Sequence, residues 1–223
     1  MAPYYTVTPF EGISALSTGR VDYAVGCVAD SKPALITNMV PRLRMAVYNA
    51  PGTDPLRQKV DDISVNTSDL YFFDYSPPLP RSHSGAWYAE LTGTLCPEAT
   101  GDYVFSLSVA GTARLFVNGD LVVDAATRQT AGGTFFGFGT GEISGCIKLE
   151  ENHPYNVTVE FGSLATSLLQ THGTDSTAGG DIRIGCAYQM NAEEEIQKAV
   201  MVAKQVDQVA IIAGLNVSLT ASH

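Results

Sequence analysis

The stretch Arg114-Leu-Phe-Val-Asn-Gly-Asp-Leu-Val-Val123 decides the fold class of this 223-residue chain. Two short runs of β-forming residues flank the dipeptide Asn118-Gly119. This dipeptide is a strong signal for a β-hairpin, because both central positions of a type I′ turn need a positive φ. We therefore predict two antiparallel strands joined by a two-residue turn.

Alternation of apolar and polar residues recurs on both sides of this hairpin. It is present in residues 43–48 and 103–109, and it is clearest in residues 155–161 (Tyr-Asn-Val-Thr-Val-Glu-Phe). A period of two is typical of a strand that buries one face. Many short strands with turn signals between them predict a mainly β fold, an antiparallel β-sandwich or barrel, over residues 39–189.

The two ends of the chain follow a different pattern. At the N-terminal end, residues 4–9 are predicted to be extended, residues 10–16 to form a short helix, and residues 21–27 to form a short strand. Residues 31–38 are predicted to be a linker. Residues 1–30 therefore form a small α/β piece ahead of the β module.

The C-terminal end, residues 190–223, changes to a helical period. Asn191 is a good N-cap and Glu194 stands where a capping box places its acidic partner. Apolar residues then fall on one helical face up to Val206. The run 208–214 (Gln-Val-Ala-Ile-Ile-Ala-Gly) is typical of a strand buried on both faces of a parallel sheet. A β module between two α/β pieces is the pattern of a domain inserted into another domain.

Charge and composition limit the classes of partner. The net charge of −10 would repel phosphate backbones and anionic membranes, so neither nucleic acid nor a membrane surface is an expected partner. No apolar run reaches the roughly 18 residues of a membrane span, and no signal-peptide pattern is visible at the start. These features leave a secreted and a cytoplasmic location both open, and a neutral ligand such as a sugar is compatible with them.

Cysteine and metal-ligand patterns predict neither a cofactor nor a metal. The four cysteines at 27, 96, 146 and 186 are far apart and contain no CxxC, which argues against zinc. Two disulfides, with three possible connectivities, and free thiols are both compatible with this spacing. The pair Asp61-Asp62 is the one calcium-like feature, and the histidines are scattered in polar loops.

The middle of the chain resembles the protective-antigen family of β-sandwich domains. The resemblance rests on four stretches in the same order: residues 87–95 (Trp-Tyr-Ala-Glu-Leu-Thr-Gly-Thr-Leu), 97–105, 111–119 and 155–161. Sugar-binding adhesins of this kind hold calcium with an adjacent Asp pair before the strand that matches residues 114–117. Here that position is Ala110-Gly-Thr112, so the resemblance does not carry the metal site over.

The flanks resemble the C-terminal α/β domain of family 3 glycoside hydrolases. Residues 5–13 and 23–27 match one side of the insertion, and residues 199–216 match the other. The resemblance implies a retaining enzyme that releases β-linked glucose with two carboxylates. Its nucleophile lies on a barrel that this chain lacks, and its acid/base Glu is expected after Gly214-Leu-Asn216, where no Glu follows. We therefore predict no catalytic residue in this chain and expect it to be inactive alone.

Residues 131–141 (Ala-Gly-Gly-Thr-Phe-Phe-Gly-Phe-Gly-Thr-Gly) are the candidate substrate-binding segment. A glycine-rich loop that presents Phe135, Phe136 or Phe138 suits stacking on a sugar ring, and the resemblance implies that the sandwich leans over the parent's active-site pocket. The alternative is a β-hairpin whose Phe side chains pack inward. For residues 69–75 and for Trp87, core packing is the favoured interpretation.

The resulting hypothesis is an accessory domain of a β-glucosidase that recognises carbohydrate and shapes the pocket. Its expected partners are a β-glucoside or oligosaccharide and the rest of the hydrolase. The alternative is a stand-alone carbohydrate-binding module without catalysis, and a third interpretation is a structural product without a ligand. The helix at 191–206 and the strand at 208–214 need covering, so we expect them to dock on the sandwich or to mediate association.

Overall fold

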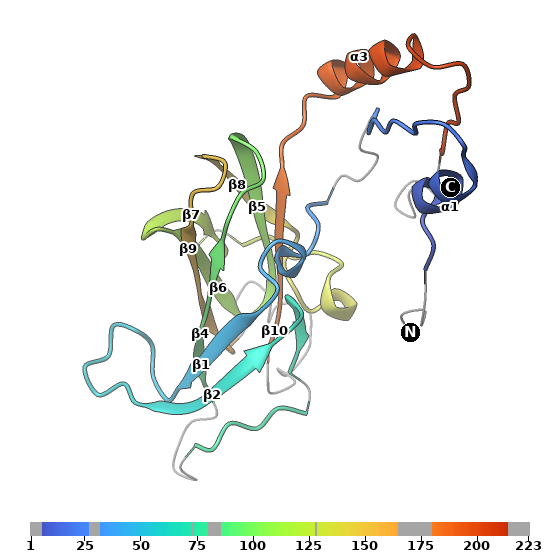
Figure 1. Cartoon of the computed structure of the whole chain (residues 1–223). Helices are drawn as coiled ribbons and strands as arrows, with labels where there is room; N and C mark the ends of the chain where they lie inside the picture. The colour runs from blue at the N-terminus through green and yellow to red at the C-terminus, as the bar shows by residue number, and fades with distance from the viewer. Residues whose placement is uncertain are drawn as a thin grey trace. The chain divides into compact units, whose positions relative to one another are not determined.

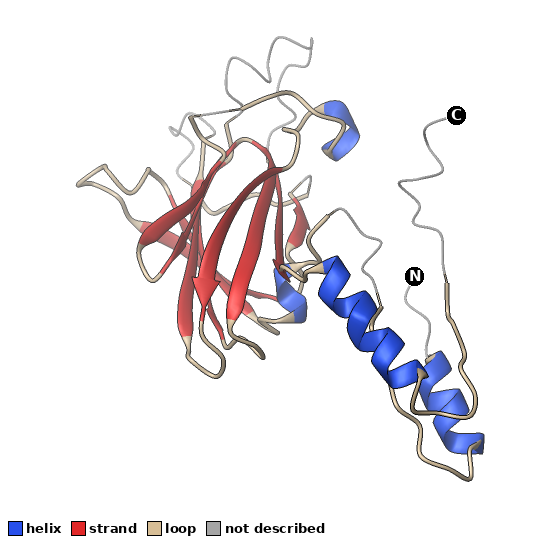
Figure 2. Ribbon diagram, turned by 90° about the horizontal axis from the view of Figure 1, so that it is seen from above, coloured by secondary structure: helices blue, strands red, loops and turns tan. Residues whose placement is uncertain are grey.

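A computed structural model describes residues 6–26, 32–72, 74–79, 86–127, 129–164 and 180–213. The chain divides into two compact units. One is Lys32–Gln189, and the other combines Met1–Ser31 with Met190–His223. All strands of the described residues lie in the first unit, and both α-helices lie in the second (Figures 1 and 2).

The first unit is a sandwich of two antiparallel sheets, as the sequence predicts. The six-stranded sheet has the order β2-β1-β4-β9-β6-β7, and the four-stranded sheet has the order β3-β10-β5-β8. The strands are β1 Leu43–Tyr48, β2 Lys59–Val65, β3 Asp69–Tyr71, β4 Tyr88–Leu95, β5 Gly101–Ala110, β6 Thr112–Val117, β7 Asp120–Asp124, β8 Ile143–Leu149, β9 Tyr155–Gly162 and β10 Asp181–Tyr188.

The predicted hairpin joins β6 to β7. Asn118 has a φ of 50° and Gly119 a φ of 91°, the left-handed values that a type I′ turn requires. The Asn118 side chain also accepts a hydrogen bond from the Asn156 backbone N–H at 2.8 Å, and its own N–H donates to the Asn156 carbonyl at 2.8 Å. The turn is therefore tied to the neighbouring strand β9, which fixes the register of three strands.

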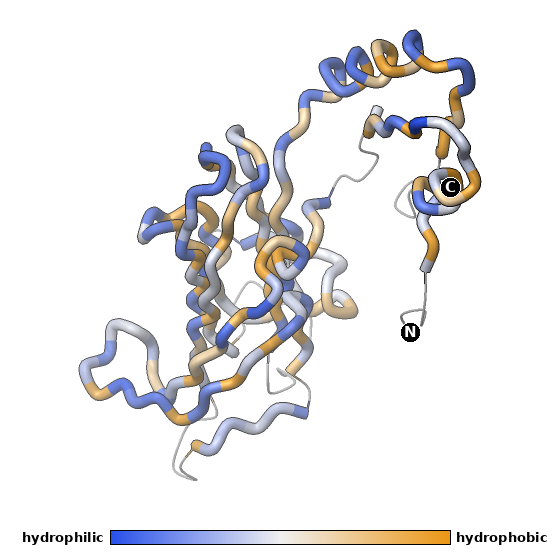
Figure 3. The backbone as a smooth tube through the Cα atoms, in the orientation of Figure 1, coloured by the Kyte–Doolittle hydropathy of each residue, from blue (hydrophilic) through white to orange (hydrophobic). Residues whose placement is uncertain are grey.

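The core lies between the two sheets and is filled by the inward-facing half of each strand. Figure 3 shows the resulting alternation of hydrophobic and hydrophilic residues along the strands. Trp87 is 2% exposed, and its ring lies edge-on to Phe72 at a centroid distance of 5.0 Å, which confirms its predicted core position. Burying each such large apolar side chain stabilises the fold by about 1.5–3 kcal/mol.

Residues 33–38, the far end of the predicted linker, contact β10. Leu35 forms a β-bridge with Gly185, and the Cys186 backbone N–H donates to the Ala34 carbonyl at 2.8 Å. The short 3₁₀ helix η1, Ile36–Asn38, then places Ile36 in the core with no exposed surface. Chain entry into the sandwich is thus fixed by backbone hydrogen bonds.

The second unit contains two capped helices. Helix α1, Pro9–Leu16, begins at the N-cap Thr8, which forms a reciprocal capping box with Glu11. Helix α3, Ala192–Ala203, begins at Asn191 as predicted, and the Asn191 side chain accepts from the backbone N–H of Glu193 at 3.1 Å. The predicted role of Glu194 is wrong in detail, because its carboxylate accepts from the Asn191 side-chain amide at 3.0 Å instead of the Asn191 backbone.

The two predicted strands of the flanks do not form within their described parts. Residues 21–26 and 208–213 have no strand structure. Ile211 and Ile212 are 85% and 68% exposed. A strand buried on both faces needs neighbouring strands and covering helices, and no described strand pairs with either segment. The expected docking or association of these flanks stays a prediction, and neither α1 nor α3 has a buried residue.

The thiols within the described residues are unpaired. Cys96 and Cys146 are exposed, whereas Cys186 on β10 is buried. Cys27 lies outside the described residues. Burial raises the pKa of the Cys186 thiol to about 12. Cys186 is therefore a neutral core residue at ordinary pH.

Neither α-helix of the described chain has the length and hydropathy that crossing a bilayer requires.

Truncation of one side chain on the inner strand β6 tests which face of the sheet is buried. Leu115 is fully buried, whereas Leu121 on the adjoining strand β7 is 51% exposed. We expect Leu115→Ala to lower the free energy of unfolding by about 2–5 kcal/mol because it opens a cavity. The matched control Leu121→Ala should change it by no more than about 0.5 kcal/mol. Equal losses in urea denaturation would contradict the assigned faces.

The buried thiol gives a pH dependence with a definite sign. An unfolded thiol has a pKa of about 8.5, so above that pH the unfolded state loses a proton that folded Cys186 keeps. Stability should therefore fall as pH rises from about 8.5 towards the folded pKa, by about 2 kcal/mol at pH of about 10. Urea denaturation across this range measures the slope. In Cys186→Ala the slope should be shallower, and an unchanged slope would rule out this cause.

Candidate functional site

The glycine-rich segment 131–141 forms a closed loop that is anchored on β5. The Thr140 backbone N–H donates to the Val109 carbonyl at 2.9 Å, and the Thr140 hydroxyl accepts from the Val109 N–H at 3.1 Å. Ala131 and Thr140 form a β-bridge across the base, and the Thr134 hydroxyl donates to the Thr140 carbonyl at 2.6 Å. These bonds fix the loop on the sandwich.

The tip of this loop has a strained backbone. The turn η2, Phe135–Gly137, has positive φ values of 51°, 59° and 89° at its three residues. Left-handed backbone is uncommon for a bulky residue and costs about 1–3 kcal/mol for each such residue. Hydrogen bonds from Gly137 and Gly139 to the Thr134 carbonyl hold the turn in place. Backbone strain of this kind clusters at functional sites, so the tip of the loop is a candidate binding site.

The three predicted substrate-binding residues have different environments. Phe135 is 6% exposed, Phe136 is 77% exposed and Phe138 is half-buried. The loop therefore combines the two alternatives that the sequence leaves open, because one ring packs inward and another faces solvent. Of the three, Phe136 is the ring that a ligand can reach most freely.

Tyr71 of β3 adds a third ring to this surface. Its ring lies 5.4 Å from that of Phe135 in an edge-on arrangement and 6.4 Å from that of Phe136. Tyr71 is 50% exposed, while Leu70 and Phe72 on either side of it are buried. We call Tyr71, Phe135 and Phe136 the aromatic platform. The predicted core packing of residues 69–75 is therefore right for alternate residues only. The period of two in this stretch already indicated that Tyr71 faces outward.

Two carboxylates, those of Asp69 and Asp181, lie near Tyr71. Asp181 of β10 pairs with Tyr71, is 5% exposed, and accepts a hydrogen bond from the Phe72 N–H at 3.0 Å. Burial raises the pKa of Asp181, and the negative charge of Asp69 raises it further. Burial and the same Asp69 charge also raise the pKa of the Tyr71 hydroxyl. The Tyr71 hydroxyl is therefore protonated at ordinary pH, and Asp181 is a buried acceptor for the Phe72 backbone.

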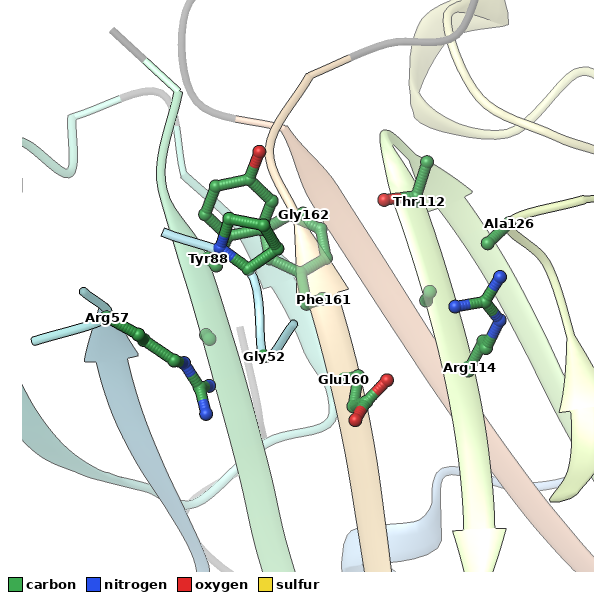
Figure 4. Close-up of a pocket in the computed structure, with 12 residues that line it drawn as sticks. Gly52, Arg57, Tyr88, Thr112, Arg114, Ala126, Glu160, Phe161 and Gly162 are labelled. Atoms are coloured by element: carbon green, nitrogen blue, oxygen red, sulfur yellow. The ribbon is translucent and has the colours of Figure 1, made fainter. Parts of the chain in front are cut away.

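A pocket of about 120 Å³ lies elsewhere, on the solvent-facing side of the six-stranded sheet (Figure 4). Two rows of cross-strand neighbours form its floor and walls: Tyr88, Gly162 and Thr112 in one row, and Glu160 and Arg114 in the next. The loop between β1 and β2 closes one side with Gly52 and Arg57. The sequence does not predict this pocket, because it joins residues from loops and strands that are far apart along the chain.

Charged side chains are arranged in and beside this pocket. The Arg57 guanidinium donates to the Glu90 carboxylate at 2.7 Å and lies over the Tyr48 ring at 3.4 Å from its centroid. Arg114 approaches Asp124 at 3.6 Å. Glu160 is exposed, and it has no ion-pair partner within the described part of the chain. In Figure 4 its carboxylate lies between the Arg57 and Arg114 side chains.

The other residues that the sequence singles out do not form a site together. Asp62 accepts hydrogen bonds from Arg44 at 2.6 and 2.8 Å and from Lys59 at 2.8 Å, which hold its pKa well below the usual range. Asp61 instead accepts from the Tyr75 hydroxyl at 3.0 Å.

Among the described residues, no group of three metal-ligating side chains comes together. Exposed His153 packs edge-on against Tyr155. The other three histidines and Gly214-Leu-Asn216 lie outside the described residues.

The fold and the loop place the chain in one class of protein domain. It is an antiparallel sandwich of two sheets that carries an anchored loop with aromatic residues. Residues 41–188 match the model of the PA14 domain, and the chain belongs to the PA14 domain family. This assignment agrees with the family that the sequence resembles.

Sequence relatives extend the similarity to both ends of the chain. The probable beta-glucosidase I of Aspergillus clavatus is 38% identical over 218 residues, which cover 95% of this chain and 26% of that protein. The probable beta-glucosidase H of Emericella nidulans is 34% identical over 217 residues, covering 97% of this chain and 26% of that protein. The chain thus spans about a quarter of the length of the curated relatives it matches.

A solved structure supports the same relationship. The beta-glucosidase from Kluyveromyces marxianus, in complex with glucose, superposes with a TM-score of 0.72 at 28% identity. The match covers 92% of this chain and 24% of that one. The similarity to beta-glucosidases covers 92–97% of the chain, so it extends beyond the sandwich into the flanks.

The strained tip makes a prediction about stability. In Phe136→Gly, relief of about 1 kcal/mol of left-handed strain should offset the lost ring contact with Tyr71, leaving stability within about 1 kcal/mol. In Phe135→Ala, loss of a buried ring should cost about 3 kcal/mol. Guanidinium denaturation of both variants measures the difference. A loss above about 2 kcal/mol in Phe136→Gly would mean that the exposed ring is structural.

Proposed function

We propose that this chain is an accessory domain of a family 3 β-glucosidase that recognises carbohydrate and shapes the substrate pocket of the parent enzyme. The observation that carries the proposal is the exposed Phe136 ring on a strained, anchored loop. The chain that carries this exposed ring is similar to a fungal beta-glucosidase over 95% of its length. The parent enzyme would hydrolyse terminal β-D-glucosyl residues, and this chain would supply no catalytic carboxylate.

Within this proposal the platform contacts the sugar beyond the cleaved bond. One face of a β-linked glucose ring carries only C–H groups, which suit the flat face of an aromatic side chain. Phe136 supplies that face, and Tyr71 lies beside it and carries a hydroxyl. Phe135 is buried against Tyr71 and supports its ring, and Phe138 of the same loop is half-buried. Such a contact contributes about 1–2 kcal/mol, or roughly 5–30-fold in affinity.

The flanks fit this role as pieces of the parent's α/β domain. We assign residues 1–30 and 190–223 to that domain, residues 31–38 to the linker and residues 39–189 to the inserted sandwich. Exposed apolar side chains in the flanks, among them Phe10, Leu16, Ile211 and Ile212, are what a larger domain would cover. The K. marxianus relative, solved with glucose bound, supports a sugar as the ligand of the complete enzyme.

A chimera tests the proposed contribution of Phe136. The chain would replace the matching quarter of the A. clavatus relative, and Phe136→Ala would be compared with unaltered chimera. We expect KM for β-linked glucose disaccharides to rise about ten-fold, because a stacking contact worth about 1.4 kcal/mol is lost. The value of kcat should stay within about two-fold, since no reacting atom is touched. Leu121→Ala, an exposed apolar residue outside the platform, is the matched control.

Two further measurements delimit the result. Unchanged KM in the Phe136→Ala chimera would reject the proposed role of the platform. The isolated chain should release no aglycone from aryl β-glucosides, and turnover proportional to its concentration would contradict a purely accessory role. Calorimetry on the isolated chain with cello- and laminari-oligosaccharides addresses the alternative. Affinity that is lost in Phe136→Ala would favour a stand-alone carbohydrate-binding module.

A further inference from the structure

We propose that the pocket on the outer face of the six-stranded sheet is a second ligand site, for a neutral, hydroxyl-rich ligand of about one sugar ring. We call it the outer-face pocket, with Arg57, Tyr88, Thr112, Arg114 and Glu160 as its polar lining. The ligand class rests on the proposed role in carbohydrate recognition, but the site does not include the aromatic platform.

The charges of the pocket select against ions of either sign. Glu160 repels an anion, because it forms no ion pair with a described residue that would neutralise its charge. Arg57 and Arg114 on either side repel a cation in the same way (Figure 4). A hydroxyl group donates to a carboxylate and accepts from a guanidinium, so a neutral polyhydroxylated ligand satisfies both sets of groups.

Arg57 is held in position before any ligand binds. Stacking on the Tyr48 ring and the hydrogen bond to Glu90 fix its guanidinium, and its side chain is only 18% exposed. Its Nε–H is buried, and within the described chain it has no hydrogen-bond acceptor. Buried donors are normally satisfied, so the unpartnered Nε–H shows that the guanidinium keeps hydrogen-bonding capacity beyond its bond to Glu90.

Glu160 lies between an unlike and a like charge, because Arg114 is directly opposite it on β6 and Glu90 is directly opposite it on β4. Like charges on directly opposite residues of neighbouring strands destabilise a sheet, and Glu160 faces Glu90 in this way. Glu90 is neutralised by Arg57, whereas Glu160 forms no ion pair with a described residue. Ligand hydroxyls that donate to Glu160 would compensate for this arrangement.

The floor of the pocket is shaped for a small ring. At Gly162 a Cβ atom would lie 2.7 Å from the Thr112 hydroxyl and 3.3 Å from the Tyr88 ring, so the backbone stays bare between these two side chains. Tyr88 then forms one wall and Thr112 the other. The volume of about 120 Å³ is below the roughly 300–1,000 Å³ of pockets for drug-sized ligands, which favours a single ring over an extended chain.

Gly52 offers a way to fill the pocket without removing a charge. A Cβ placed on Gly52 would lie 3.9 Å from both Arg57 Nη1 and Glu160 Oε1, at ordinary contact distance. A larger side chain at this position would therefore enter the space between the two groups. Gly19, with its nearest atom 4.0 Å away and in the other unit, is a matched control for the same substitution.

The test is a titration of the full chain with D-glucose and cellobiose at millimolar concentrations, followed by backbone amide NMR. We expect the amides of Gly52, Thr112 and Gly162 to shift. Gly52→Leu, which fills the pocket, and Glu160→Gln, which keeps its shape and removes the acceptor charge, should each weaken binding about ten-fold. Gly19→Leu and Phe136→Ala should bind as the unaltered chain does.

The proposal fails if the pocket amides do not shift, or if Gly52→Leu and Glu160→Gln leave the affinity unchanged. Preserved amide dispersion in each variant confirms that it is folded, and Glu160→Gln supplies the answer if Gly52→Leu is not. Shifts confined to residues 131–141 and Tyr71 would overturn the pocket while supporting the platform. Because the platform is tested by the kinetics of the chimera, the two ideas can fail independently.

Discussion

The passage of the chain from one sheet to the other at Gly111 is the constraint on which the rest of the sandwich depends. Strand β5 ends at Ala110 in the four-stranded sheet, and β6 begins at Thr112 in the six-stranded sheet. Gly111 has a φ of 143°, and any Cβ there would collide with the Gly162 carbonyl. Only glycine can make this one-residue crossing, which brings the two layers together at one end of the sandwich.

The same crossing brings both candidate binding surfaces to that end. Ala110 pairs with Asp181, which pairs with Tyr71 of the aromatic platform. Thr112 pairs with Gly162, which pairs with Tyr88 of the outer-face pocket. The platform and the pocket therefore belong to opposite layers of one end, and the rigidity of the core fixes both.

The sequence predicts those features that are local along the chain. Asn118-Gly119, the alternation in β1 and β9, and the N-cap Asn191 each act over a few residues, and the structure has all of them. Features that need a distant partner were missed or wrong. Tyr71 gains its importance from Phe135, and the pocket needs the pairing of Glu160 with Arg114. The apolar run 208–213 is a strand only where neighbouring strands exist, and here it has none among the described residues.

The candidate loop shows how a single segment divides between stability and recognition. Gly139 lets the chain turn beside Thr134 and Phe135, where a Cβ would not fit. In the same turn Phe135 lies inward and Phe136 outward, from adjacent left-handed positions. Burial of the ring accounts for the strain at Phe135, whereas the Phe136 ring is 77% exposed and gains less from burial. The proposed sugar contact would give this second strained position its use.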